Sequence, residues 1–234
     1  AEHSAAGTFR SLERLSPSGQ KSPRPRRISR ALQNPQAALD RGKLLHAWFE
    51  EIEWSEDPPP TADDLRAIAV EFNSNSPEPI PDAAIDQYLV DFQRILSQPD
   101  IAFRLSRRVY QSANGNQFPP AVRAWLLAEP IELEVAWEHS IAVPCDGRLI
   151  IGSIDRLVLI LSHKTVIAAD ILDFKTDEIP NHRGVLQRRA REYSEQLRLY
   201  ARAVQQMYDL SPEQITASLL FVTTGQVVPV PLEG

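Results

Sequence analysis

The sequence predicts an α+β domain in which one helix precedes three antiparallel strands, a second helix and a fourth strand. Three segments rich in Ile, Val and Leu follow one another, separated by turns too short to hold helices: residues 131–143, 148–161 and 165–175. Apolar residues recur at helical spacing before these segments, at 42–54, and after them, at 187–208. The apolar segment ITASLLFVTT at 215–224 is typical of a further strand.

The composition is that of a globular protein, with 43% hydrophobic residues in a chain of 234. No run of eighteen apolar residues is present and the first residues do not resemble a signal peptide, so we expect neither a membrane span nor export. The single cysteine, Cys145, excludes a disulfide framework and four-cysteine zinc or iron–sulfur sites, and it favours the reducing cytoplasm. The only methionine is Met207, so residue 1 is not a translation start, and we expect the chain either to be processed or to be part of a longer polypeptide.

Residues 1–40 carry prolines, serines and a basic cluster without sustained periodicity. We interpret this range as a linker or N-terminal arm, with a short helix around Phe9–Leu15. The basic cluster either contacts phosphate groups or belongs to a solvated linker; it consists of Lys21, Arg24, Arg26, Arg27 and Arg30. The domain itself is expected over residues 41–234.

Within that domain, the helix at 42–54 places Leu45, Trp48 and Phe49 on one face and ends before the prolines at 58–60. Residues 61–128 read as a helical insertion, because Thr61 occupies an N-cap position and Pro81 precedes a second amphipathic run. Turns at 145–147 and 162–164 would then join the three strands into an antiparallel meander.

Two carboxylates are expected to meet at the end of this meander. Asp173 and Lys175 point to the same side of a strand, because side chains alternate along it, and an acid and a base after an apolar run are costly unless they serve a purpose. Asp155, in Gly152-Ser153-Ile154-Asp155, can lie beside Asp173 across the hairpin. A divalent cation is the simplest way to offset two converging carboxylates.

His46 on the first helix would add an imidazole, with Gly42 one turn earlier allowing close approach. Carboxylate oxygens suit Mg²⁺ or Mn²⁺, and one imidazole favours tolerance of Mn²⁺. Lys175 would assist the attacking water or neutralise the charge that develops on a phosphate. Together these residues are typical of a site that hydrolyses a phosphodiester. Taken singly, an Asp-x-Lys pair is more often an exposed salt bridge and a lone histidine more often a packed side chain.

On the second helix, Gln196 and Tyr200 are four residues apart and share one face, and Tyr193 lies on the same flank. Tyr200 either packs on the sheet or serves the substrate, whereas packing explains Gln196 less well. Arginines gather around this helix and at 104–108, where they form either a solvated face or a DNA-binding one.

These residues form four short motifs in a fixed order. They are G-x-x-x-H (Gly42, His46), G-x-x-D (Gly152, Asp155), D-[FY]-K-T (Asp173 to Thr176) and Y-x-x-Q-L-x-x-Y (Tyr193, Gln196, Leu197, Tyr200). The set resembles the RecB-family nuclease domain of the PD-(D/E)XK superfamily, and the similarity extends from Gly42 to Gly225. The resemblance implies a restriction-endonuclease-like core with a helical insertion.

By this resemblance, His46, Asp155, Asp173 and the backbone carbonyl of Phe174 would bind the metal, and Lys175 would be the catalytic lysine. Gln196 and Tyr200 would support the catalytic site and the DNA strand. Glu134, in ELEVAW, resembles the acidic residue before an aromatic on the family's first strand.

The resemblance also implies partners and a setting. Members with an iron–sulfur cluster carry four cysteines, so this chain resembles the C-terminal nuclease domain of AddA- or RecB-type helicase–nucleases, which follows a UvrD-like motor. No G-x-x-x-x-G-K-[ST] phosphate loop is present, so the motor would be another part of the polypeptide, and a second nuclease subunit is a further candidate partner. The implied activity is Mg²⁺- or Mn²⁺-dependent exonucleolytic cleavage of single-stranded DNA during bacterial double-strand-break repair.

Two other interpretations remain. The chain could be a catalytically inactive member of the family that binds DNA or a partner protein. It could also be a small domain whose acid–lysine pairs are merely structural, and in that case no metal would stabilise it.

Overall fold

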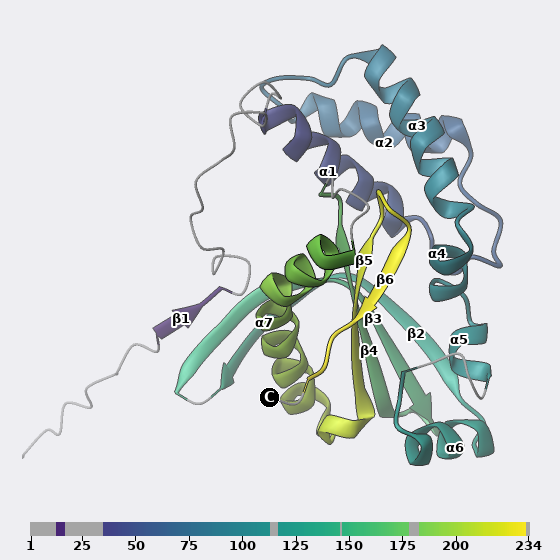
Figure 1. Cartoon of the computed structure of the whole chain (residues 1–234), viewed down its shortest axis with the longest axis vertical. Coiled ribbons are helices and arrows are strands. Elements are labelled where there is room, and N and C mark those ends of the chain that lie inside the picture. Colours follow the sequence, from purple (N-terminus) through teal and green to yellow (C-terminus); the bar gives the residue numbers. More distant parts are fainter. Residues whose placement is uncertain (1–12, 17–34, 113–116, 146, 178–182, 233–234) are drawn as a thin grey trace, which may run out of the picture.

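The structure, a computed structural model, describes residues 13–16, 35–112, 117–145, 147–177 and 183–232. In this part of the chain, six strands form one mixed sheet with helices on both faces (Figure 1). In chain order the elements are β1 (Glu13–Leu15), α1 (Pro35–Glu50), α2 (Ala62–Ser74), α3 (Asp82–Leu96), α4 (Pro99–Arg104), α5 (Arg108–Gln111), α6 (Pro120–Ala128), β2 (Glu132–Cys145), β3 (Arg148–Ser162), β4 (Thr165–Lys175), α7 (Arg183–Tyr208), β5 (Ile215–Phe221) and β6 (Gln226–Pro229).

The predicted order of helix, three strands, helix and strand is confirmed. Strands β2, β3 and β4 form the antiparallel meander, and α7 then crosses over so that β5 pairs with β4 in parallel. Two short strands were not predicted: β6 pairs antiparallel with β5, and β1 pairs parallel with the first residues of β3.

The N-terminal range departs from the prediction in two places. The first helix begins at Pro35 rather than Gly42, inside the range interpreted as a linker. The short helix expected around Phe9–Leu15 is wrong over its described residues, because Glu13–Leu15 hydrogen-bonds as a strand to Arg148–Ile150. The basic cluster at 21–30 lies outside the described residues.

The insertion at 61–128 is helical, as predicted, and contains α2 to α6. The hydroxyl of Thr61 accepts the backbone N–H of Asp64, whose carboxylate accepts the backbone N–H of Thr61 in return, so a capping box starts α2. Apolar side chains of α1 to α4 pack together and against Leu172, Phe174 and Leu220 of the sheet. The insertion therefore extends the hydrophobic core on one face of the sheet.

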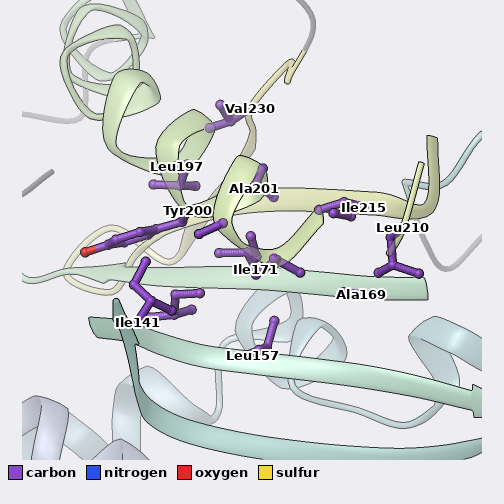
Figure 2. Packing of buried hydrophobic residues seen from close by; sticks show 14 of the residues in the cluster. Ile141, Leu157, Ala169, Ile171, Leu197, Tyr200, Ala201, Leu210, Ile215 and Val230 are labelled. Carbon is purple, nitrogen blue, oxygen red and sulfur yellow. The ribbon is translucent and has the colours of Figure 1, made fainter. Parts of the chain in front are cut away.

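The opposite face is covered by α7. Figure 2 shows Leu197, Tyr200 and Ala201 of this helix above Ala169 and Ile171 of β4. Because Ile171 packs under α7 and Leu172 packs under α1, β4 is buried on both faces. This double burial explains why the strand is a nearly continuous apolar run that polar residues enter only at particular positions.

Strands β3 and β4 separate at the end where the candidate site lies. Their ladder ends at the pair Arg156↔Leu172, whereas β4 stays paired with β5 as far as Lys175↔Phe221. Asp155 and Asp173 are the next residues on the two separating strands. The fold therefore opens a gap in backbone pairing where the two predicted carboxylates meet.

Candidate metal centre

Helix α1 approaches the end of β4 closely because Gly42 has no side chain. A β-carbon at Gly42 would lie 2.8 Å from Oγ1 of Thr176, which follows β4 directly. One turn later His46 faces β3, and its Nδ1 is 3.7 Å from Oδ2 of Asp155. The rings of Phe49 and Phe174 stack with centroids 4.4 Å apart and hold the helix against the strand.

The carboxylate of Asp155 occupies the gap between β3 and β4. Its Oδ2 accepts the backbone N–H of Phe174 at 2.7 Å, which supplies a partner for an amide beyond the end of the ladder. Burial and the charge of Asp173 raise the pKa of Asp155 to about 7, although His46, Lys175 and the Phe174 amide act in the opposite direction. The ionised form of Asp155 would therefore be stabilised by a nearby cation.

Asp173 is the most exceptional polar residue of the site. It is 1% exposed, and neither of its carboxylate oxygens has a hydrogen-bond partner among the described residues. Its charge is met by an ion pair between Oδ2 and the ammonium of Lys175, which the sequence placed on the same side of the strand. A buried carboxylate with unused lone pairs is costly unless a cation binds it.

Glu138 on β2 completes a group that the sequence analysis did not find. One oxygen of Glu138, one oxygen of Asp155 and a ring nitrogen of His46 all lie within 4.8 Å of one another. Contact with His46 lowers the pKa of Glu138. Burial alone would lower the pKa of His46, but Glu138 and the charges of Asp155 and Asp173 outweigh it, so that pKa is raised.

Glu134, the strand acid suggested by the sequence, lies elsewhere. It pairs opposite Leu159, and its charge acts on Tyr208 near the end of α7. Position 138 lies opposite Asp155, between the pairs Trp137↔Arg156 and His139↔Ile154, and its backbone has a positive φ of 42°. Oε1 of Glu138 lies 3.8 Å from Nδ1 of His46.

Gln196 and Tyr200 are close to each other, with Nε2 of the amide donating to the tyrosine oxygen at 3.1 Å. Tyr200 is 2% exposed and packs into the core under α7, and burial raises its pKa to about 12. A β-carbon at Gly152 would lie 2.9 Å from its ring, so the glycine of G-x-x-D makes room for this tyrosine. Tyr200 therefore packs against β3 at Gly152, which lies three residues before Asp155.

The donor set fits a divalent cation. Carboxylate oxygens with one imidazole are ligands that Mg²⁺ and Mn²⁺ accept, and the carboxylate of Asp173, ion-paired with Lys175 but without a hydrogen bond among the described residues, has lone pairs left for such an ion. Lys175 is on the same strand face as Asp173. The geometry therefore brings candidate metal ligands and a cationic side chain together in one partly buried place.

Comparison with protein families matches residues 20–231 to the PD-(D/E)XK nuclease superfamily. The chain belongs to this superfamily. Its members are typically metal-dependent nucleases, and the fold and the metal-binding cluster agree with that membership. Comparison with curated proteins gave no match.

The structure brings Asp155 together with Asp173-Phe174-Lys175 where the β3–β4 ladder ends: Oδ2 of Asp155 accepts the Phe174 N–H, and Asp173 forms an ion pair with Lys175. Among the helices that the structure describes, none is long and apolar enough to cross a membrane.

Proposed function

We propose that this chain is a divalent-metal-dependent deoxyribonuclease domain that hydrolyses phosphodiester bonds of single-stranded DNA. The observation that carries the proposal is the buried carboxylate of Asp173, unpartnered apart from Lys175 and adjacent to Asp155. A structural salt bridge would not require a second buried carboxylate and a histidine beside it. A metal-assisted hydrolytic site accounts for all of them, with the carboxylates and the histidine as ligands and the lysine as a charge partner.

Hydrolysis forms one P–O bond from water and breaks the P–O bond to the leaving sugar oxygen, while a proton leaves the water and one reaches the leaving oxygen. His46, Asp155, Asp173 and the carbonyl of Phe174 would hold the cation, together with Glu138, whose carboxylate oxygen lies within 4.8 Å of ligand atoms of His46 and Asp155. When bound, Mg²⁺ or Mn²⁺ supplies Lewis-acid activation of water and neutralises charge on the phosphate. Lys175 donates hydrogen bonds to the negative charge that develops on the phosphate oxygens.

The finer assignment follows the RecB-type motifs. We assign the chain to the nuclease part of an AddA- or RecB-type helicase–nuclease in the bacterial cytoplasm, acting on strands delivered by a UvrD-like motor in the same polypeptide during recombinational repair. The helix motif supports this assignment. Gln196 donates a hydrogen bond to Tyr200, and the ring of Tyr200 packs on β3 at Gly152, close to Asp155. Local delivery by a motor would compensate for a net charge of −6.

The decisive experiment is cleavage of an end-labelled single-stranded oligonucleotide with Mg²⁺, Mn²⁺ or EDTA. We expect metal-dependent cutting that falls about 100-fold or more in Lys175→Ala, because an electrostatic donor to the transition state is lost. Lys164→Gln is the matched control, because this exposed lysine lies in the turn before β4. Asp173→Asn should abolish both cutting and metal binding.

Calorimetric titration of the same proteins with Mn²⁺ separates the alternatives. Binding without cutting, lost in Asp173→Asn, would support the inactive family member that only binds DNA or a partner. Absence of both cutting and metal binding would overturn the nuclease proposal. Equal activity of Lys175→Ala and the wild type would remove the lysine from the mechanism.

A further inference from the structure

The ammonium of Lys175 lies over the aromatic ring of Tyr193. The distance from Nζ to the ring centroid is 4.4 Å, within the range in which the π face of a ring attracts a cation. The Lys175 side chain is 12% exposed and Tyr193 is 7% exposed, so little water screens the contact. Helix α7 thus carries a ring to the catalytic end of β4.

The ring itself is held from its far end. The hydroxyl of Tyr193 donates a hydrogen bond to Oδ2 of Asp177, two residues beyond Lys175. The carbonyl of Asp177 in turn accepts a hydrogen bond from the Thr223 hydroxyl at 2.8 Å. This bond connects the residues that follow β4 to the turn after β5. Burial and the Asp177 contact raise the pKa of Tyr193, so its hydroxyl keeps the proton that it donates.

Lys175 needs such support because its ion pair with Asp173 weakens once a cation shares that carboxylate. The backbone N–H of Val222 donates to the Lys175 carbonyl at 3.1 Å, but this bond places only the main chain. The ammonium ends a side chain of four rotatable bonds, and its ion pair is with Asp173. When Asp173 binds a cation, that carboxylate is shared and its attraction for Lys175 weakens.

We propose that Tyr193, oriented by Asp177, is a positioning residue that holds the Lys175 ammonium toward the reacting phosphate through a cation–π contact. The proposal deepens the nuclease function proposed above and its kinetic part rests on it. Tyr193 does not touch substrate in this scheme; it acts through Lys175. The ring, not the hydroxyl, is the group in direct contact with the ammonium.

The first test observes Lys175 directly by NMR and does not depend on turnover. The chain has four lysines (Lys21, Lys43, Lys164 and Lys175), so lysine-labelled protein gives a simple spectrum that Lys175→Ala assigns. We expect upfield ring-current shifts of the Lys175 Hε protons, both without metal and with Mg²⁺, that disappear in Tyr193→Met. Unshifted Hε protons in the Mg²⁺-loaded wild type would overturn the proposal.

The second test is kinetic. Tyr193→Met should lower kcat about tenfold while KM for the oligonucleotide and Mn²⁺ affinity change less than twofold, and Tyr193→Phe, which keeps the ring, should retain most of kcat. Tyr208→Met, at the far end of α7, is the matched control and should leave kcat unchanged. The double variant Lys175→Ala/Tyr193→Met should be no slower than Lys175→Ala alone.

The outcomes separate the two proposals. If the wild type does not cut, the proposed function fails whatever the variants do, and the NMR shift alone decides whether the ring holds the ammonium. If the wild type cuts and Tyr193→Met is equally fast, only the positioning role fails. Should Tyr193→Met not fold, fluorinated phenylalanines at 193 replace it, because they weaken the π face without changing size; kcat independent of fluorination would also overturn the proposal.

Discussion

Asp155 lies beside Asp173 in a place with little water, and the charge of His46 acts on the pKa of Asp155. Burial and the charge of Asp173 raise the pKa of Asp155 to about 7, and the surrounding carboxylates raise the pKa of His46 despite its burial. Metal ligands must be deprotonated to bind. A cation therefore has to displace protons from this group near neutral pH.

This coupling gives a prediction for metal binding. Below about pH 6 both His46 and Asp155 hold protons, so Mn²⁺ affinity should be weak. The affinity should rise between pH 6 and 8, by up to about tenfold per unit for each proton released. Titration calorimetry in two buffers of different ionisation enthalpy measures the protons released. An affinity that does not change over this pH range would contradict the raised pKa values.

At the scale of elements, close approach between α1 and β4 positions His46, and the approach depends on Gly42. Its missing side chain leaves room for Thr176, whose Oγ1 would lie 2.8 Å from a β-carbon at that position. Alanine is otherwise the better helix former by roughly 0.5–1 kcal/mol. The glycine is therefore explained by packing between elements and not by the conformation of the helix.

The effect of a side chain at position 42 should be reversed when the side chain of Thr176 is shortened. We expect Gly42→Ala to lower the free energy of unfolding by about 1–3 kcal/mol and to weaken metal binding, because α1 must move away from Thr176. Thr176→Ala in the same chain should restore both. Gly184→Ala is the matched control, because a β-carbon there meets nothing within 4 Å. Chemical denaturation measures the series, and failure of Thr176→Ala to rescue would refute the steric explanation.

The same scale shows how far the sequence could predict this site. The meander, α7 and β5 follow from local apolar patterns, and His46, Asp155, Asp173 and Lys175 follow from motif order. Glu138 was missed because the motif places the acid before an aromatic residue, whereas Glu138 follows Trp137. Counting back from the pair Cys145↔Arg148 at the hairpin turn would have placed position 138 opposite Asp155.

Contacts between distant elements carry no such local signal. Arg104 of α4 donates to Oδ1 of Asp170 on β4 at 2.7 Å, and Tyr110 of α5 donates to Oδ2 at 2.6 Å, all fully or nearly fully buried. The partners are 66 and 60 residues apart in sequence, so neither periodicity nor motif spacing could pair them. This buried ion pair attaches the helical insertion to β4, the strand that carries Asp173 and Lys175.

For the whole molecule, the site lowers stability while no cation is bound. A raised pKa means that the ionised form of Asp155 is disfavoured in the folded state, so its contribution to stability falls as pH rises from about 4 through about 7. The raised pKa of His46 acts in the same direction, because the stability from its protonated form is lost as pH rises through that pKa. Metal-free protein should therefore be less stable at pH 8 than at pH 6.

Asp155→Asn tests this trade-off, because the amide oxygen can still accept the Phe174 N–H while the charge is removed. At pH 8 without metal, we expect the variant to be more stable than the wild type by on the order of 2 kcal/mol, a rise in Tm of about 5 °C for a chain of this size. Mn²⁺ should raise the Tm of the wild type and not that of the variant. Thermal melts at pH 6 and 8, with Mn²⁺ or EDTA, measure all three effects. A variant less stable than the wild type at pH 8 would mean that Asp155 is held by structural contacts and not kept for a cation.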